Sequence, residues 1–319
     1  MKEWGRVSYP PLLSSAKVGS IWGQGVGRSP APAIPGVDCS MPQIHRLAVA
    51  ALALLLTAAP AAAQQAGPMV PGLLRVCADP DNMPFSNEAQ EGFENRLATL
   101  LATAWNSQLQ YLWWAAPRGL FSKALNGRYC DVILQAPTGY DMAGVTRPYY
   151  RTGYVIVQLA DAPHKVTSLD DPALKTMKIG IHLFSADAEN TPPAMALSAH
   201  GVVGNLVGFS TTFVGGLARP EDIIKAVADG TVDLAMVWGP LAGYYAKRVG
   251  ADLSLTPIPD DTLTSTPMAF SMGIATRRRE RAFRDSLQHF LDTRQADVTA
   301  LLTEYGFPLF PIPPDSAGS

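Results

Sequence analysis

The sequence has 319 residues, of which 47% are hydrophobic and 16% are charged. This composition supplies enough apolar surface for a large core and excludes an intrinsically disordered chain. Lysine and arginine number 25 against 27 aspartate and glutamate residues, which gives a net charge of -2. Because no broad basic field is present to bind a nucleic-acid backbone or an anionic membrane, we expect a globular protein that does not bind nucleic acid.

Residues 41–63 have the three-part pattern of a secretory signal peptide. Arg46 precedes an unbroken apolar run over residues 47–59, and the small residues Ala61-Ala62-Ala63 follow it. The run is shorter than the roughly 20 residues that a membrane-spanning helix needs. We therefore expect cleavage near Ala63, a periplasmic location and no membrane insertion afterwards. Residues 1–40 are interpreted as a wrongly assigned start or as a disordered extension.

Short apolar strands alternate with helices over residues 64–159. Apolar residues at one-face spacing predict a helix over 93–104, and a short helix is expected over 119–125. Strands are expected at 73–78, 109–114, 131–135 and 154–158. This alternation favours parallel strand pairing, with cleft residues at the carboxyl ends of the strands. Three residues are expected at such ends: Asp79, Asp81 and Pro137.

The alternation starts again over residues 160–263. Strands are expected at 178–182, 206–209, 234–237 and 253–257, and helices at 192–200, 220–230 and 240–249. Thr191 and Pro192 are typical of a helix start, and Gly230 of a helix end. Over residues 264–319 the chain is expected to return to the first lobe, with a strand at 268–275 and a helical region at 279–305. Two α/β lobes are predicted, and crossings near 156–166 and 258–268 would form a hinge between them.

Cys77 and Cys130 remain after the expected cleavage, since the third cysteine, Cys39, precedes it. An even number of cysteines in an oxidising compartment favours a disulfide between them. The alternative interpretation is two buried, reduced thiols, because cysteine is often a small apolar core residue. Without a Cys-x-x-Cys spacing, redox catalysis has little support.

Several motifs occur in a characteristic order, among them LRVCADPDNMPFSN, EGFEN, YCDVILQAPTGYD, TRPYYRTGYV and DLAMVWGPLAGYYAKR. Over about residues 72–308 the sequence resembles the MxaJ/MoxJ/XoxJ family. These are periplasmic solute-binding-like accessory proteins of quinoprotein alcohol dehydrogenase systems in methanol-oxidising bacteria.

The resemblance implies an α/β fold of the type II periplasmic binding protein kind. Each of its two lobes would be a mixed sheet flanked by helices, with a hinge of two crossings. It also implies a protein that is not an enzyme and holds no cofactor. Its partner would be a periplasmic quinoprotein alcohol or methanol dehydrogenase, which it would help to mature or activate by protein–protein contact.

The same region is similar, more distantly, to receptors for polar amino acids, and it departs from them at two places. Those receptors hold the ligand carboxylate with an arginine a few residues before a Phe-Ser-x-Pro-Tyr motif. Here residues 137–144 precede Arg147-Pro148-Tyr149 and contain no cation. The receptors hold the ligand ammonium with an aspartate two residues before a proline, where this chain has Trp238.

A cleft without both charge anchors is expected to bind amino acids poorly, because unpaired buried charges are costly. The alternative function is therefore the solute-binding component of an ABC uptake transporter for a ligand other than an amino acid.

Asp79 and Asp81 flank Pro80 at the end of the first expected strand. Paired carboxylates can bind a cation or transfer protons. Turn formation and capping of the next helix are the favoured interpretation, because aspartate and asparagine are common in turns. Asn82 and Glu94 would extend the set to oxygen ligands, but no EF-hand spacing is present and metal binding is a weak hypothesis.

Aromatic and cationic residues near strand ends are the other candidates for cleft or partner contacts. Trp113 and Trp114 are adjacent on a strand and point to opposite faces, so one of them is expected to be structural. Trp238 is a candidate for contact with a ligand or partner, and filling the junction between the lobes is an equally weighted interpretation. The set is completed by Arg118, Arg147 and Tyr149.

Either arginine of this set could hold an anion, although surface salt bridges are the commoner use. The sequence lacks a zinc-ligand spacing, a Gly-x-Ser-x-Gly elbow and a phosphate-binding loop, which makes an enzyme the least favoured class.

Overall fold

The structure is a computed structural model that describes residues 67–115, 118–183, 191–210 and 219–314. All of these residues belong to one compact unit, Ala62–Ser319. The expected signal peptide, its cleavage site and residues 1–40 lie outside the described residues. In the described part, no helix is long and apolar enough to span a bilayer.

The first lobe begins with a β-α-β unit. Strands β1 (Leu73–Ala78) and β4 (Gln108–Trp113) pair in parallel, and α2 (Phe93–Ala104) connects them. The apolar stripe of α2 places Phe93, Leu97 and Leu101 at 0% exposure in the same core cluster as the inward residues of β1. The sequence predicts the bounds of these elements to within one residue.

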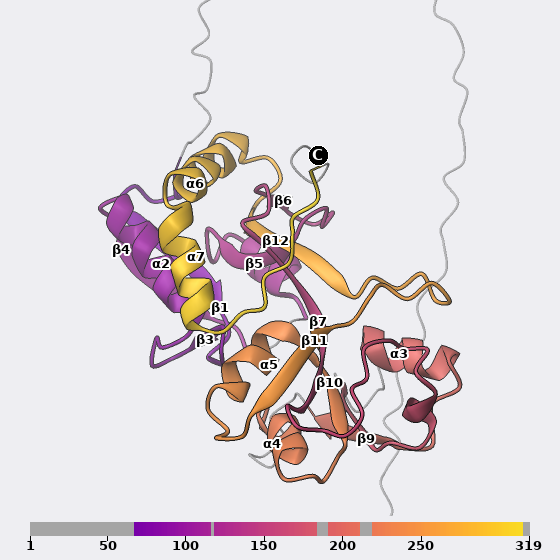
Figure 1. The fold of residues 1–319 in the computed structure, drawn as a ribbon. Coiled ribbons are helices and arrows are strands. Elements are labelled where there is room, and N and C mark those ends of the chain that lie inside the picture. Colours follow the sequence, from indigo (N-terminus) through magenta and orange to yellow (C-terminus); the bar gives the residue numbers. More distant parts are fainter. Residues whose placement is uncertain (1–66, 116–117, 184–190, 211–218, 315–319) are drawn as a thin grey trace, which may run out of the picture. The chain divides into compact units, whose positions relative to one another are not determined.

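An eight-stranded sheet runs through both lobes in the order β5-β12-β7-β10-β8-β9, with β11 paired to β7 and β6 paired to β12. Figure 1 shows β7 as the long strand in its middle. The bounds of these strands are β5 (Ile133–Pro137), β6 (Gly144–Val145), β7 (Tyr150–Leu159), β8 (Ile179–Leu183), β9 (Leu206–Ser210), β10 (Leu234–Trp238), β11 (Leu253–Pro257) and β12 (Ala269–Thr276).

Strand β7 belongs to both lobes. Residues 150–153 pair with β12, and residues 154–159 pair with β10 and β11, in every case antiparallel. The parallel pairing predicted from strand–helix alternation holds for β1 with β4 and for β8 with β9 and β10. It is wrong for β7, β11 and β12, because these strands carry the chain between the lobes and back. The mixed sheets implied by the family resemblance are confirmed.

The passage into the second lobe therefore lies within β7, earlier than the expected crossing at 156–166. The return passage is the segment 258–268, which leads directly into β12. Helices α3 (Pro192–Ala199), α4 (Asp222–Ala228) and α5 (Gly239–Ala246) belong to the second lobe. Its core divides into a cluster with α3 and a cluster with α4 and α5.

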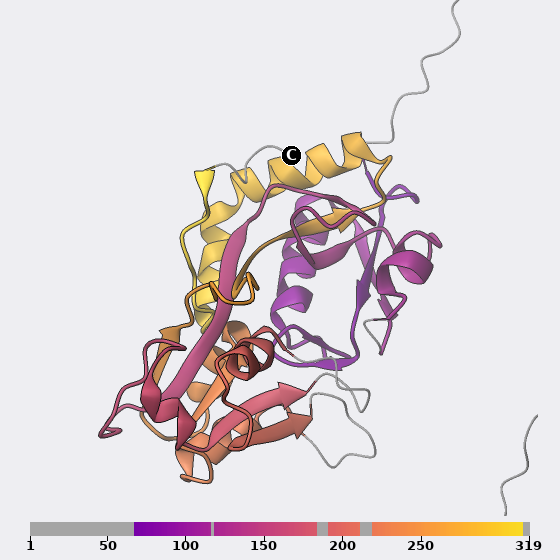
Figure 2. The same ribbon diagram turned by 90° about the vertical axis from the view of Figure 1, so that its right-hand side faces the viewer.

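The expected helical region at 279–305 is two helices, α6 (Arg281–Thr293) and α7 (Gln295–Glu304), which separate at Arg294. Their apolar residues join the core cluster of α2, so the carboxyl-terminal part completes the first lobe (Figure 2). Gly306 has a φ of 76° and ends α7. A Cβ at Gly306 would lie 2.7 Å from the carbonyl oxygen of Gly243, so α5 and this turn approach each other closely.

The disulfide between Cys77 and Cys130 is confirmed. It joins the end of β1 to the segment before β5 over 53 residues, with Cα atoms 5.5 Å apart. Beside it Asp131 is 0% exposed and accepts hydrogen bonds from the guanidinium groups of Arg75 at 2.9 Å and Arg277 at 3.4 Å. Two cations thus compensate the buried carboxylate.

Four short elements complete the fold. They are the strands β2 (Asp81–Asn82) and β3 (Ser86–Asn87), the π-helical turn η1 (Leu120–Leu125) and the 3-10 helix η2 (Pro172–Lys175).

Candidate functional site

The segment after β1 is a tight hairpin that holds the candidate acids. The amide of Asp81 donates to Asp79 Oδ1 at 2.9 Å, and the Ser86 hydroxyl bonds both the amide and the carbonyl of Asp79. Strands β2 and β3 then pair Asp81 with Asn87 and Asn82 with Ser86. Asp79 is half-buried, whereas Asp81 and Asn82 are exposed. Burial raises the pKa of Asp79 despite the Asp81 amide, which acts in the opposite direction.

Glu94 is the acid with the most altered environment at this edge. It is the second residue of α2 and is 8% exposed. Burial, followed by the nearby Asp79 carboxylate, raises the pKa of Glu94 to about 8. Such a carboxyl is protonated at neutral pH and can donate a hydrogen bond or a proton. From the sequence, Glu94 is expected only as a weak metal ligand, because no local pattern predicts its burial.

Aromatic rings surround the start of α2. Phe93 lies 5.1 Å from Phe307 and 6.3 Å from Tyr150, measured between ring centroids. The hydroxyl of Tyr149 donates to the carbonyl of Leu134 at 2.8 Å, whereas no residue in the described part of the chain forms a hydrogen bond with the buried hydroxyl of Tyr150. Burial raises the pKa of both tyrosines well above the usual value, and Glu94 adds to the shift. The resulting core is apolar and brings Tyr149 close to Glu94.

Trp238 ends β10 and precedes α5. Its ring is 5.2 Å from that of Tyr154 and 5.9 Å from that of Phe270, measured between centroids. It is half-buried and contacts one core cluster of each lobe. The side chain therefore packs at the junction between the lobes, which is one of the two interpretations that the sequence leaves open, and its contact with a ligand or partner stays a prediction.

Trp113, the last residue of β4, and Trp114, which follows it, contact different core clusters. Trp113 stacks on Tyr111 at 4.6 Å in the cluster of α2. Trp114 packs in the cluster of the disulfide, and its indole nitrogen donates to the carbonyl of Arg118 at 3.3 Å.

The candidate arginines are exposed. Arg147 forms an ion pair with Asp292 of α6 at 2.7 Å, and its amide donates to the side chain of Gln288 at 2.7 Å. Its guanidinium is therefore already bound to a carboxylate. Arg118 contributes its carbonyl to Trp114, as described above.

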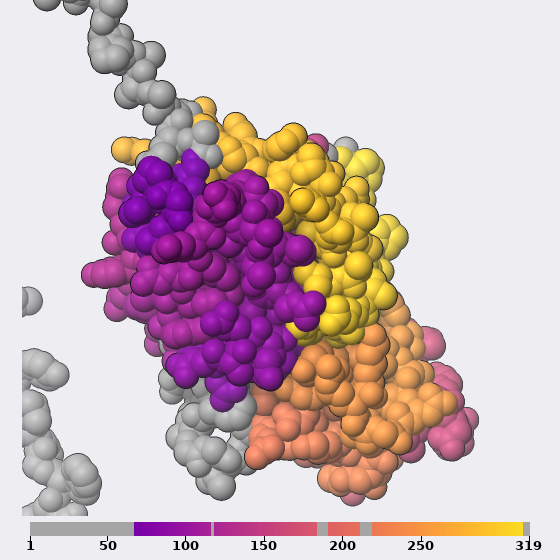
Figure 3. Space-filling view, turned by 90° about the vertical axis from the view of Figure 1, so that its left-hand side faces the viewer, coloured from indigo at the N-terminus to yellow at the C-terminus, as the bar shows by residue number. Residues whose placement is uncertain are grey.

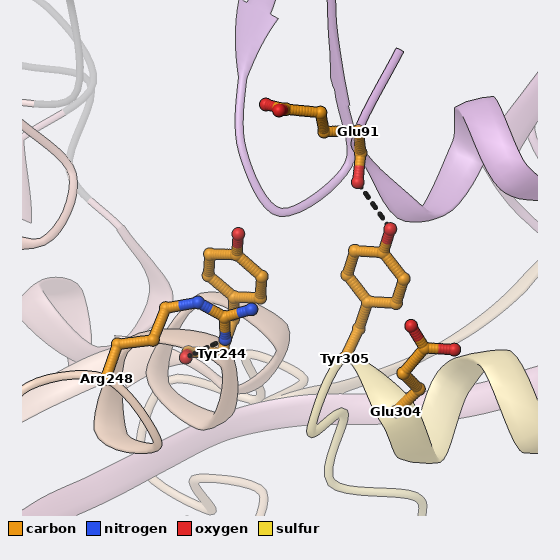
Figure 4. A pocket seen from close by; sticks show the side chains of 5 residues that line it. All are labelled: Glu91, Tyr244, Arg248, Glu304 and Tyr305. Carbon is orange, nitrogen blue, oxygen red and sulfur yellow. Dashed lines mark hydrogen bonds between the residues drawn. The ribbon is translucent and has the colours of Figure 1, made fainter. Parts of the chain in front are cut away.

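A cavity of about 300 Å³ lies where three segments meet, on the face shown in Figure 3. It is lined by Tyr244 and Arg248 of the second lobe and by Glu91, Glu304 and Tyr305 of the first. In Figure 4 the Arg248 guanidinium lies over the Tyr244 ring, 3.5 Å from its centroid, and the Tyr305 hydroxyl donates to the Glu91 carbonyl. No sequence motif predicts this cavity, because its lining residues come from segments that lie far apart in the chain.

Within the described ranges, no three histidine, cysteine, aspartate or glutamate side chains group as metal ligands. Glu94 is the one acid of the first-strand edge described here whose pKa is raised to near neutrality, and aromatic rings dominate its surroundings.

Comparisons with known proteins identify both a matching family and individual relatives of this chain. The family model of bacterial extracellular solute-binding proteins matches residues 114–308. The chain is 28% identical over 254 residues to Protein MoxJ of Methylorubrum extorquens, covering 76% of this chain and 83% of that protein.

Two crystal structures are similar over the whole of their own chains. That of the periplasmic binding protein XoxJ from Methylobacterium extorquens AM1 is 32% identical, with a TM-score of 0.61 and coverage of 75% of this chain and 100% of that one. That of MxaJ from Methlophaga aminisulfidivorans MPT is 26% identical, with a TM-score of 0.66 and coverage of 74% and 100%.

Proposed function

The chain belongs to the bacterial extracellular solute-binding protein family, in the MxaJ/MoxJ/XoxJ group, and we propose that it is an accessory protein of a periplasmic quinoprotein alcohol dehydrogenase of the methanol type. In this proposal it helps the dehydrogenase to mature or to become active by direct contact. It carries out no reaction itself and holds no cofactor.

The similarity to XoxJ, at 32% identity over the whole of that chain, carries this proposal. The arrangement at the lobe junction supports it. Trp238 packs between Tyr154 and Phe270 at the place where an amino-acid receptor would need a carboxylate. An aromatic ring there cannot neutralise a ligand ammonium in the way that a carboxylate does, although it suits protein contact.

The proposal includes export. A signal peptide at 41–63 would be removed near Ala63, and the mature chain would then comprise a first lobe at 64–159, a second lobe at 160–263 and a return to the first lobe at 264–319. Cleft or partner contacts would come from Asp79, Asp81, Asn82, Trp114, Arg118, Arg147, Tyr149 and Trp238.

The test compares the cognate dehydrogenase made with and without this chain. We expect the mature chain to co-purify with the dehydrogenase in at least one folding or cofactor state. We also expect deletion to lower dehydrogenase activity, with restoration by the intact gene as the control. Absence of association in every state, together with unchanged activity after deletion, would contradict the proposal.

The second candidate is the receptor of an uptake transporter for a solute other than an amino acid. The family match and the cavity between Tyr244 and Tyr305 favour it. Neighbouring genes discriminate the two, because permease and ATPase genes indicate transport whereas dehydrogenase and cytochrome genes indicate the accessory function.

A further inference from the structure

Four arginines lie around the start of α6 without an acidic partner among the described residues. Arg278, Arg279 and Arg281 are exposed, and Arg284 is half-buried. In the described part of the chain, no carboxylate lies within 4.0 Å of these four guanidinium groups. Arg277, directly before them, is buried and pairs with Asp131 and Glu280. The cluster is therefore distinct from the structural arginine beside the disulfide.

The position of these arginines is unfavourable for the helix itself. Arg281 is the first residue of α6, Arg284 follows one turn later, and the first turn contains no acidic residue. The amino terminus of a helix carries a partial positive charge, so cations there are destabilising. The acid next to them, Glu280 at the amino-terminal cap of α6, is paired with Arg277. Residues that act against the local structure are expected at functional sites.

Apolar side chains are exposed on the neighbouring loop. Tyr140 is 36% exposed and Met142 is 41% exposed. The Tyr140 ring packs on Phe121 of η1 with centroids 4.5 Å apart, and its hydroxyl contacts the Met142 sulfur at 3.5 Å. Asn126 fixes the same loop by donating to the Met142 carbonyl at 3.1 Å. The apolar group is thus held in place by the fold.

The arginines and the apolar loop form one surface. Arg278 Nη1 donates to the carbonyl of Asp141, between Tyr140 and Met142, at 2.7 Å. A Cβ built on Gly144 would lie 3.5 Å from Arg284 Nη1. Figure 2 shows the beginning of α6 on the same side of the first lobe as η1. We define the arginine–aromatic surface by the arginines Arg278, Arg279, Arg281 and Arg284 and by the apolar residues Phe121, Tyr140 and Met142.

This composition fits a protein partner. Arginine, tyrosine, phenylalanine and methionine are enriched in protein interfaces, and charge complementarity calls for acidic residues opposite the arginines. All four unpaired cations are arginine, whose planar guanidinium binds carboxylates in a bidentate manner. Binding to an anionic lipid surface requires a broad basic patch, and the chain has a net charge of -2. A protein partner is therefore favoured over a lipid surface.

We propose that the arginine–aromatic surface docks an acidic segment of the dehydrogenase, one in which apolar side chains lie between the carboxylates. The proposal rests on the proposed function and adds to it a contact on the surface of the first lobe that carries the start of α6.

The experiment measures the affinity of the mature chain for purified cognate dehydrogenase by titration at several salt concentrations. The main variant is Arg278→Glu/Arg279→Glu. Because Arg278 also holds the loop through Asp141, a second variant, Arg279→Glu/Arg281→Glu, changes only side chains without a described contact. Lys175→Glu/Lys178→Glu, on exposed residues of the second lobe, is the charge-matched control. Tyr140→Ser/Met142→Ser tests the apolar part, and near-ultraviolet circular dichroism verifies the fold of each variant.

We expect both arginine variants to raise Kd about tenfold or more and to flatten the dependence of Kd on salt. The apolar variant should raise Kd and keep the salt dependence, while the control matches the wild type. If the wild type binds and the arginine variants bind like the control, the surface assignment is wrong and the proposed function stands. A wild type that does not bind contradicts the proposed function, and this inference with it. Loss of binding to vesicles of anionic lipid in the arginine variants, with dehydrogenase binding unchanged, would assign the surface to lipid and overturn the proposal.

Discussion

Glu94 lies in a water-poor environment at the start of α2, and its pKa of about 8 compares with a usual value of 4.5. Between about pH 4.5 and about pH 8, the folded chain therefore keeps a proton on Glu94 that the unfolded chain loses. Stability from this group is fully present below about pH 4.5 and is lost as the pH rises through 8. We expect Glu94→Gln to reduce the fall in the free energy of unfolding between about pH 5 and about pH 8.5. Urea unfolding at several pH values measures it, with Glu88→Gln on the exposed hairpin as the control. An unchanged pH slope would show that Glu94 titrates normally.

The burial of Glu94 could not be predicted from the sequence, whereas the turn before it could. The turn residues Asp79 and Asp81 can be located from local sequence, because a turn depends on neighbours in the chain. The burial of Glu94 depends on Tyr149 and Tyr150, which come from β7 and its approach, far along the chain. Its altered pKa is a property of packing that no local pattern contains.

Hydrogen bonds connect the return segment at 258–268 to the residue that follows α3. His200, which follows α3, contacts Asp261 at 2.9 Å, and the amide of Thr264 donates to the other carboxylate oxygen at 2.8 Å. Burial acts to raise the pKa of Asp261, but the bonds from Thr264 and His200 outweigh it and lower the pKa to about 2. The stabilisation that the ionised Asp261 carboxylate contributes is therefore present above pH 3.8 and is lost as the pH falls through 2.

We expect Asp261→Asn to lower the free energy of unfolding by about 1–3 kcal/mol at neutral pH, because hydrogen bonds to a charged group are lost. The difference from the wild type should shrink as the pH falls toward 2. Chemical unfolding at neutral and acid pH measures it, and Asp260→Asn, on the adjacent residue, serves as the comparison. A pH-independent difference would mean that the ionised carboxylate is not the source of the effect.

The disulfide fastens β1 to the segment before β5 and encloses α2, β4 and η1. Closing a loop of 53 residues restricts the unfolded chain, and the chain-entropy model gives roughly 4 kcal/mol of stabilisation. Cys77→Ala/Cys130→Ala should lower the free energy of unfolding by up to this amount, as should reduction of the wild type. Thiol titration of the unfolded, unreduced protein is the direct check, and two reactive thiols would contradict the bond.

Most elements could be predicted from the sequence, whereas the direction of their pairing could be predicted only in part. β1 and α2 follow from apolar periodicity and from the Asp-Pro turn between them, which are local signals. β7 and β12 have equally clear apolar runs, but their antiparallel direction depends on the chain passing between lobes and returning about a hundred residues later. The break between α6 and α7 at Arg294 also escapes prediction, because no glycine or proline marks it.

The whole molecule has the fold of a solute-binding protein, and two described positions at which an amino-acid receptor is expected to hold its ligand are already engaged within the chain. Trp238 packs between Tyr154 and Phe270, and Arg147 is bound to Asp292. Neither the ammonium nor the carboxylate of an amino acid would therefore find a charged partner at these positions, and each would lose hydration on entering.

We accordingly expect no saturating binding of free α-amino acids by the mature chain in titration calorimetry. Micromolar affinity would require about −8 kcal/mol, which apolar contact at a lobe junction does not supply to an uncompensated zwitterion. An amino-acid receptor of the same fold, titrated under the same conditions, is the positive control. A saturating isotherm for any amino acid would contradict the expectation, and Arg118→Ala and Arg147→Ala would then show which guanidinium holds the carboxylate. If amino acids do not bind and the Arg278→Glu/Arg279→Glu variant loses affinity for the dehydrogenase, the functional contact of this protein lies on the arginine–aromatic surface. The two lobes would then serve to hold that surface in place.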